Sequence, residues 1–383
     1  MRPITLPGTG FHSTGAYGAM EQPIVTFVVP CYKLAHFLPD CIRSILAQSY
    51  RDFEILIMDD ASPDHTAEVV RAFPDPRVRC VRNQPNLGHL KNYNKGIELA
   101  RGKYVWLISA DDYLRRPYVL EKYVDLLNNH PTVGYVFCAG VWVKGGVETE
   151  IVDYSVYSTR DRIVHGHILL KKLLKRNLVL AASGLVRREC YERWGTFPLN
   201  MPWAGDWFLW CLFALFYDVA YCAEPMVCYR VHERSMGQQL NQAQAKACCL
   251  EEIAIQWTIG ALAEDEGLKS VARQCRQAVA QRYARSVAGT RFGRSQPLMN
   301  LEECEESVRI NAPDVKVTKA ILALVLAAIG NEYYWKGELE LAKTFYDRAL
   351  RSNSLMPTVW AKRLLLTVGS SGHTLRTLIR SAR

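Results

Sequence analysis

Three patterns are missing from this chain of 383 residues, and each absence excludes a class of protein. The twelve cysteines are scattered without a CxxC pair, which argues against a zinc site and against a disulfide-stapled secreted protein. The longest apolar runs, Trp207–Tyr217 and Ala320–Ile329, are shorter than the roughly 20 residues that span a bilayer. The N-terminus lacks the charged and then apolar segment of a secretory signal. We therefore expect a cytoplasmic protein.

The chain also lacks a basic stripe interleaved with aromatic residues, so nucleic acid is not an expected partner. Its formal net charge of +9 nevertheless favours an anionic partner, such as a nucleotide, a pyrophosphate-linked acceptor or a phospholipid surface. With 49% hydrophobic and 22% charged residues, a chain of this length is expected to be globular and to form about two domains.

Strand-like and helical segments alternate in the N-terminal half. The apolar runs Ile24–Val29 and Phe53–Met58 flank a helical pattern at Leu38–Gln48. Three further strands are expected at Val78–Arg82, Tyr104–Ser109 and Val133–Val143. Strand, helix and strand at this spacing predict an α/β fold, in which a mostly parallel sheet is flanked by helices.

The pattern divides the chain into three segments. Residues 1–22 are rich in Gly, Pro, Thr and Ser and are expected to form a flexible leader. Residues 23–240 form the predicted α/β domain. From residue 241 to 383 the strands disappear and long helical patterns predict an all-α region.

Two features of the helical region suggest association. Residues from about 323 to 356 carry small and aromatic side chains at the spacings of one tetratricopeptide repeat, including Gly330, Gly337 and Ala342. The alternative is a helical hairpin that packs only on its own domain. The end of the chain, Thr374–Arg383, is basic and amphipathic, which suits peripheral contact with the inner face of the membrane or a solvated helix end.

Paired carboxylates follow two of the predicted strands. Asp59 and Asp60 end one buried run, and Asp111 and Asp112 end the run that begins at Trp106. In open α/β sheets, ligands bind beyond the carboxyl ends of the strands, and hard oxygen ligands suit Mg²⁺ or Mn²⁺. This placement points to a nucleotide-diphosphate site with a divalent cation, although acids after a strand also start ordinary turns.

A series of motifs in this order resembles family 2 glycosyltransferases. They are Val28-Val29-Pro30-Cys31-Tyr32, the stretch from Ile57 to Asp64, Asn86-Leu87-Gly88 with Asn92, Asn94, Gly96 and Ile97, Ala110-Asp111-Asp112, the stretch from Gly205 to Trp210, and Tyr229-Arg230-Val231-His232. The resemblance extends to about residue 235. It implies the GT-A fold and transfer of a sugar, with inversion, from a nucleotide-diphosphate-sugar donor in polysaccharide or glycoconjugate biosynthesis.

The resemblance also implies which residues bind the donor. It places Pro30 and Tyr32 beside the nucleoside and Asp60 within reach of the base or ribose. It assigns Asp111 and Asp112 to a bound Mn²⁺ or Mg²⁺ that bridges to the diphosphate, and we expect Asp112 to contribute more than Asp111. The sequence departs from the usual Asp-x-Asp pattern here, because a serine precedes Ala110 where many members have the first acid.

The same comparison assigns a general base and a phosphate-binding element. Asp206 matches the carboxylate that takes the proton from the acceptor hydroxyl, although Gly205 replaces the Glu that often precedes it. Arg230 and His232 match an Arg-x-His element near the diphosphate. The implied partners are a nucleotide-sugar donor and a saccharide or lipid-linked acceptor, and the implied class is a hexosyltransferase-like enzyme.

Two other functions compete with this one. A nucleotidyltransferase also uses acids at strand ends, but no Gly-rich basic loop follows the first strand. A repeat-bearing scaffold with a decayed transferase domain is the second alternative, and intact Asp60, Asp112 and Asp206 argue against it. His165 and His167 lack a third ligand and are expected to be structural.

Overall fold

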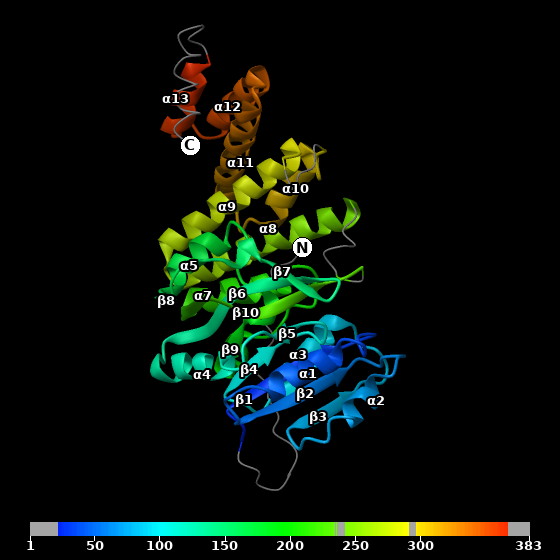
Figure 1. The fold of residues 1–383 in the computed structure, drawn as a ribbon. Coiled ribbons are helices and arrows are strands. Elements are labelled where there is room, and N and C mark those ends of the chain that lie inside the picture. Colours follow the sequence, from blue (N-terminus) through cyan, green and yellow to red (C-terminus); the bar gives the residue numbers. More distant parts are fainter. Residues whose placement is uncertain (1–21, 234, 236–241, 291–295, 367–383) are drawn as a thin grey trace. The chain divides into compact units, whose positions relative to one another are not determined.

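The computed structural model describes residues 22–366 except 234, 236–241 and 291–295. The expected leader and the basic end of the chain lie outside these residues, apart from residue 22. The described residues form two compact units, one up to residue 235 and one from residue 242 (Figure 1). The first contains a mixed sheet with helices, and the second is helical.

The N-terminal unit is built on one ten-stranded sheet with the main order β3-β2-β1-β4-β9-β6-β10-β5. Its strands are β1 (Val25–Cys31), β2 (Phe53–Asp59), β3 (Val78–Arg82), β4 (Tyr104–Leu107), β5 (Tyr113–Leu114), β6 (Val133–Lys144), β7 (Val147–Ile151), β8 (Arg162–Val164), β9 (Leu185–Arg187) and β10 (Asp218–Val231). The first four are parallel to one another, as the strand and helix alternation predicts. Strand β9 pairs antiparallel with both β4 and β6, so the sheet is mixed.

Helices cover both faces of this sheet. They are α1 (Leu38–Leu46), α2 (Thr66–Arg71), α3 (His89–Leu99), α4 (Val119–Asn129), α5 (Gly166–Leu173), α6 (Arg188–Trp194) and α7 (Gly205–Phe216). The apolar sides of α1 and α4 share one buried core with the inward residues of β1, such as Phe27 and Val29. Val28 points to the opposite face, because successive strand residues alternate. There it meets Gly96 of α3, where a larger residue would clash with the strand.

The apolar helix α7 also lies on the face that carries α3. Tyr135 of β6 donates from its hydroxyl to the carbonyl oxygen of Trp210, at 3.3 Å, and the two rings pack 5.1 Å apart. Val136, the residue after Tyr135 in β6, belongs to the core on the opposite face of the sheet, together with α1 and α4. Burial of ten of the twelve residues of α7 explains why its sequence is apolar all round. A helix held so firmly fixes the position of its first turn, which contains Asp206.

The C-terminal unit consists of α8 (Gln242–Asp265), α9 (Lys269–Ala288), α10 (Leu301–Asn311), α11 (Val315–Lys336), α12 (Leu339–Ser352) and α13 (Pro357–Leu365). In the α11–α12 hairpin, Gly330 leaves room for the ring of Tyr346, which would lie 2.6 Å from an added Cβ. In the α8–α9 hairpin, Gly260 lies 70 positions before Gly330, and a Cβ added there would lie 3.1 Å from the Cβ of Cys275 in α9.

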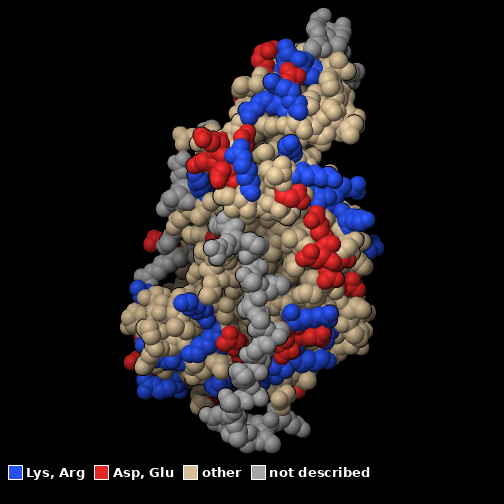
Figure 2. Space-filling view, turned by 180° about the vertical axis from the view of Figure 1, so that it is seen from behind, with Lys and Arg blue, Asp and Glu red and all other residues tan. Residues whose placement is uncertain are grey.

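No described helix is long and apolar enough to span a bilayer. On the face shown in Figure 2, acidic and basic side chains are interspersed, and the described residues there form no continuous basic strip. The net charge of +9 is therefore not concentrated into one band on this face. The expectation that nucleic acid is not a partner stays a prediction.

Candidate functional site

The carboxyl ends of β1, β2 and β4 meet at one edge of the sheet. In the parallel register, Cys31 lies beside Asp59, and Val28 lies beside Leu107. This brings the turns that follow the three strands together and places Pro30 and Tyr32 beside the first acid pair. Tyr32 is 44% exposed, and Lys33 Nζ lies 5.0 Å from the centre of its ring, so the residue is accessible to a planar ligand such as a nucleobase.

Asp60 is buried and anchors the chain from residue 83 to residue 88. Its Oδ1 accepts hydrogen bonds from Asn83 Nδ2 at 2.9 Å and from the backbone N–H of Leu87 at 2.8 Å. Its Oδ2 accepts from the backbone N–H of Gly88 at 3.0 Å. With the side chain only 2% exposed, most of the carboxylate's acceptor capacity is used inside the protein. Asp60 therefore positions the residues before α3, whatever it contributes to a ligand.

Asp64 joins the turns after β1 and β2. One carboxylate oxygen accepts from the hydroxyl groups of Ser62 at 2.6 Å and Thr66 at 2.5 Å. The other accepts from the backbone N–H of Ala35 at 3.1 Å. These bonds outweigh the effect of burial and lower the pKa of Asp64 to about 2. The motif from Ile57 to Asp64 ends at this residue. The sequence did not predict that Asp64 links the turns after β1 and β2.

Asp111 and Asp112 have different surroundings, although they are adjacent. His232 Nε2 lies 3.0 Å from Asp111 Oδ2, and no described residue hydrogen-bonds to the buried Asp111 Oδ1. Asp112 is 4% exposed, and its Oδ1 accepts the backbone N–H of Arg230 at 2.9 Å. Burial, and then the charge of Asp111, raises the pKa of Asp112 well above its ordinary value.

Arg230 is buried beneath this turn. Its guanidinium donates to the carbonyl oxygen of Asp111 at 2.9 Å and to Asp40 Oδ2 at 3.1 Å, and it stacks over the ring of Phe37. Asp40 belongs to α1, so Arg230 ties β10 and the turn after β4 to that helix. Arg230 therefore holds the turn that carries the acid pair against α1. His232, two residues later, lies beside the Asp111 carboxylate.

Asp206 occupies the first turn of α7. Its Oδ1 accepts from the backbone N–H of Trp207 at 2.7 Å, and its Oδ2 accepts from Asn177 Nδ2 at 3.3 Å. Burial raises the pKa of Asp206 to about 6, although these hydrogen bonds oppose the shift. A carboxylate with this pKa is ionised at neutral pH and can still bind a proton readily, as a general base must.

Three tyrosines lie near both Asp206 and the second acid pair. The hydroxyls of Tyr93, Tyr154 and Tyr229 have pKa values raised by burial and then by nearby carboxylates. For each of them those carboxylates include both Asp112 and Asp206. The charges of Asp112 and Asp206, 94 positions apart in sequence, therefore both act on these three hydroxyls. Tyr93, Tyr154 and Asn177 had not been singled out, because they lie outside the acid pairs and carry no local signal.

The residues around Asp111 suit a divalent cation whose remaining coordination positions are filled by a bound ligand. Among the residues that the structure describes, no group of three or more His, Cys, Asp or Glu side chains could hold a metal by itself. Asp111 and His232 nevertheless offer two adjacent ligand atoms, and Asp111 Oδ1 is buried without a partner. Mg²⁺ and Mn²⁺ are commonly held by one or two carboxylates together with substrate phosphates.

The other histidines considered from the sequence have structural contacts. His167 Nε2 lies 2.9 Å from the carbonyl oxygen of Leu215, and His165 Nδ1 accepts from the backbone N–H of His167 at 3.4 Å, at the start of α5. His167 therefore joins α5 to α7, whereas His165 caps the start of α5.

Several proteins with similar sequences are glycosyltransferases. Residues 26–192 match the model of glycosyl transferase family 2. An uncharacterized glycosyltransferase of Haemophilus influenzae is 27% identical over 58% of this chain and 70% of its own length. Glycosyltransferase GlyG of Streptococcus pneumoniae is 34% identical over 24% of this chain and 31% of its own length.

Comparison with solved structures gives the same fold. The structure of S. aureus TarS 1-349 in complex with UDP-GlcNAc has a TM-score of 0.58, with 15% identity, over 84% of this chain and 90% of that one. The mixed sheet thus has the GT-A fold, and a helical region follows it. The family match covers residues 26–192, and this part of the chain is similar to glycosyl transferase family 2.

Proposed function

We propose that this protein transfers a sugar from a nucleoside-diphosphate donor to a hydroxyl group of a saccharide or lipid-linked acceptor, with inversion at the anomeric carbon. The observation that carries the proposal is the position of Asp206. It is a single carboxylate with a pKa of about 6, and its charge acts together with that of Asp112 on the hydroxyls of Tyr93, Tyr154 and Tyr229. The nucleotide-sugar bound to TarS supports a donor of this chemical class.

In the proposed reaction, Asp206 accepts the proton of the acceptor hydroxyl. The acceptor oxygen then forms a bond to the anomeric carbon, and the bond from that carbon to the diphosphate oxygen breaks with its electron pair. Attack opposite the leaving group inverts the anomeric configuration. Asn177 and the backbone N–H of Trp207 hold the carboxylate in place for the proton transfer.

A bound divalent cation would neutralise the charge that develops on the departing nucleoside diphosphate. We propose Asp111 and His232 as its protein ligands. Asp112 supports them through its hydrogen bond to the backbone of Arg230. This proposal gives Asp111 the larger part in metal binding, whereas the sequence analysis expected Asp112 to contribute more. Tyr32 is proposed to cover the nucleobase, with Pro30 in the same loop, while Asp60 orders the facing turn and offers its remaining acceptor capacity to the base or ribose.

The proposal is tested first by donor binding and then by the stereochemistry of the product. A thermal-shift series with nucleoside diphosphates and nucleotide-sugars, with and without Mn²⁺, should raise the melting temperature for the cognate base, because a ligand of the native state stabilises it. NMR of the product from an α-linked donor should then show a β-linkage. Retained configuration would overturn inversion, and no stabilisation by any nucleotide would overturn donor binding.

A further inference from the structure

The segment from residue 157 to residue 177 of the N-terminal unit is strongly basic. It contains six Lys or Arg residues and a single acid, Asp161. Strand β8 and helix α5 both lie within it, so two neighbouring elements carry these charges. The six basic residues are all exposed, namely Arg160, Arg162, Lys171, Lys172, Lys175 and Arg176. A considerable part of the net positive charge is therefore gathered in one short stretch of the surface.

Helix α5 has one buried side and one basic side. Its leucines are buried, and the helix packs against α7. The exposed residues of the helix and of the turn after it follow the i, i+3, i+4, i+7 spacing of one helix face, namely Ile168, Lys171, Lys172 and Lys175. Ile168 is 54% exposed in the middle of these lysines. The outer face of α5 is thus a basic surface with an apolar side chain at its centre.

Strand β8 adds to this basic surface. Lys172 Nζ lies 4.3 Å from the centre of the Tyr157 ring. Burial raises the pKa of the Tyr157 hydroxyl, and the nearby charge of Arg162 opposes this rise. Arg162 of β8 and Lys172 of α5 are therefore both close to Tyr157. Ile163, the residue after Arg162, is 43% exposed, so β8 also offers a basic and an apolar side chain.

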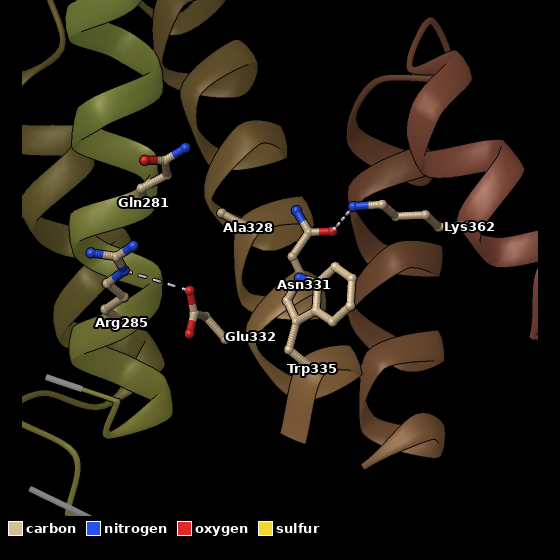
Figure 3. A pocket seen from close by; sticks show the side chains of 7 residues that line it. All are labelled: Gln281, Arg285, Ala328, Asn331, Glu332, Trp335 and Lys362. Atoms are coloured by element: carbon tan, nitrogen blue, oxygen red, sulfur yellow. Dashed lines mark hydrogen bonds and ion pairs between the residues drawn. The ribbon is translucent and has the colours of Figure 1, made fainter. Parts of the chain in front are cut away.

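The charges of this surface are not paired with acids. Among the residues that the structure describes, no carboxylate lies within ion-pair distance of Arg160, Arg162, Lys171, Lys172 or Arg176. Asp161 instead pairs with Lys122 of α4, at 2.8 Å. In the helical unit, by contrast, Arg285 lies 3.7 Å from the carboxylate of Glu332 (Figure 3). The basic groups of β8 and α5 are therefore available to an anionic partner.

We propose that the exposed surface of β8 and α5, from Arg160 to Arg176, binds an anionic phospholipid membrane. The negative potential of such a membrane attracts Lys and Arg, and exposed apolar side chains enter the boundary between headgroups and acyl chains. Ile163 and Ile168 supply those apolar contacts, whereas the phosphate backbone of a nucleic acid would offer them no apolar partner. Basic residues near the end of α5 also suit a helix C-terminus, but this does not account for the basic and apolar residues of β8.

Helix α5 leads directly to the residues proposed for proton transfer. The carbonyl oxygen of Leu173, its last residue, accepts from Trp207 Nε1 at 2.8 Å. Asn177, the residue after Arg176, donates to Asp206. A membrane bound at α5 would therefore lie near the base, and a lipid-linked acceptor would be presented to it. This consequence rests on the proposed function, whereas the membrane contact itself does not depend on transfer.

The test is cosedimentation of the full chain with vesicles of phosphatidylcholine, alone or with about one third phosphatidylglycerol. We expect binding only to the anionic vesicles, and less of it as the salt concentration rises. The double variant Lys171→Glu/Lys172→Glu should lower the partition coefficient by about tenfold or more, because two attractive charges become repulsive. The matched control is Lys316→Glu/Lys319→Glu, which makes the same change of charge at exposed positions of α11.

Two further variants make the test independent of a single substitution. Ile168→Ser removes the apolar contact without a change of charge, and it should weaken vesicle binding at low and at high salt. Circular dichroism checks the folding of each variant. If Lys171→Glu/Lys172→Glu does not fold, Arg160→Glu/Arg162→Glu replaces it, because these two positions are exposed and lie outside α5.

The inference would be overturned if the parent protein does not bind anionic vesicles, or if it and the folded double variant bind them equally. It would also be overturned if Arg376→Glu/Arg380→Glu abolishes binding while the α5 variant does not, because the contact would then be the basic end of the chain. Binding of single-stranded nucleic acid in place of vesicles would overturn it as well. Asp206→Asn separates the two proposals, since it should abolish transfer and leave vesicle binding unchanged.

Discussion

The side-chain amide of Asn177 donates a hydrogen bond of 3.3 Å to the carboxylate of Asp206, 29 residues later in the chain. This bond favours the charged carboxylate and so opposes the burial that raises the pKa of Asp206 to about 6. Asn177 comes from the segment after α5, whereas Asp206 begins α7. The proton affinity of the proposed general base is therefore set by two elements that meet only in the folded chain.

Asn177→Ala should move the acid limb of the pH profile of kcat/KM to higher pH. Without the amide donor, the charged form of Asp206 loses stabilisation, so its pKa rises above about 6 by about half a unit to one unit. The base must be ionised, so activity at pH 6 should fall more than activity at pH 8. Asn353→Ala, in the helical unit, is the control. A uniform loss at every pH would indicate a merely structural role for Asn177.

Asp206→Asn should reduce turnover by at least about 10²-fold, because the amide cannot accept the proton of the acceptor hydroxyl. Affinity for the nucleotide-sugar should stay close to that of the parent protein, since the residue acts on the acceptor. Pre-steady-state turnover and calorimetric donor binding measure the two effects. Near-normal turnover with a cognate acceptor would remove Asp206 from the role of base.

The same substitution should stabilise the fold above pH 6. Folding raises the pKa of Asp206 from its ordinary value to about 6, so the charge on this partly buried carboxylate costs free energy that increases from about pH 4 and is complete above about pH 6. Asp206→Asn removes this cost and should raise the free energy of unfolding by about 1–3 kcal/mol at pH 8, with little change at pH 4. Urea unfolding at the two pH values measures it. Equal free energies of unfolding for the variant and the parent protein at pH 8 would contradict the raised pKa of Asp206.

Asp111→Asn should weaken Mn²⁺-dependent binding of nucleoside diphosphates by about tenfold or more, because it removes a charged oxygen ligand. Asp112→Asn is the matched variant: its amide oxygen can still accept the backbone N–H of Arg230, so a smaller effect is expected. Calorimetry with and without chelator compares the two. Full activity in excess chelator, or a larger effect at Asp112, would refute the proposed ligand order.

Asp60→Ala should lower the free energy of unfolding by at least about 2 kcal/mol, because the buried amide of Asn83 and the backbone N–H groups of Leu87 and Gly88 lose their acceptor. Nucleoside affinity should fall with it, since the turn before α3 loses its anchor. Asp125→Ala, an exposed acid on α4, is the control for loss of a carboxylate. Unchanged unfolding would contradict the anchoring role, and unchanged nucleoside binding would remove Asp60 from the donor site.

Local sequence patterns determined the parallel half of the sheet and the helices around it. Strand β2 was predicted to within one residue, because a continuous apolar run between polar turns has few other buried solutions. The acids after β2 and β4 reach the same edge because parallel strands end together. The antiparallel strand β9 between β4 and β6 was not predicted, since three residues carry too little periodicity to specify a partner.

Only the tertiary structure determined the different surroundings of the two adjacent acids Asp111 and Asp112. Asp111 and Asp112 are indistinguishable as neighbours in sequence, yet one faces His232 and the other is buried against the backbone of Arg230. The contacts from Asn177 to Asp206 and from Tyr346 to Asn331 likewise join separate segments. A residue's type specifies the bonds it can form, but partners distant along the chain are selected by packing, which determines burial, pKa and the space left for a ligand.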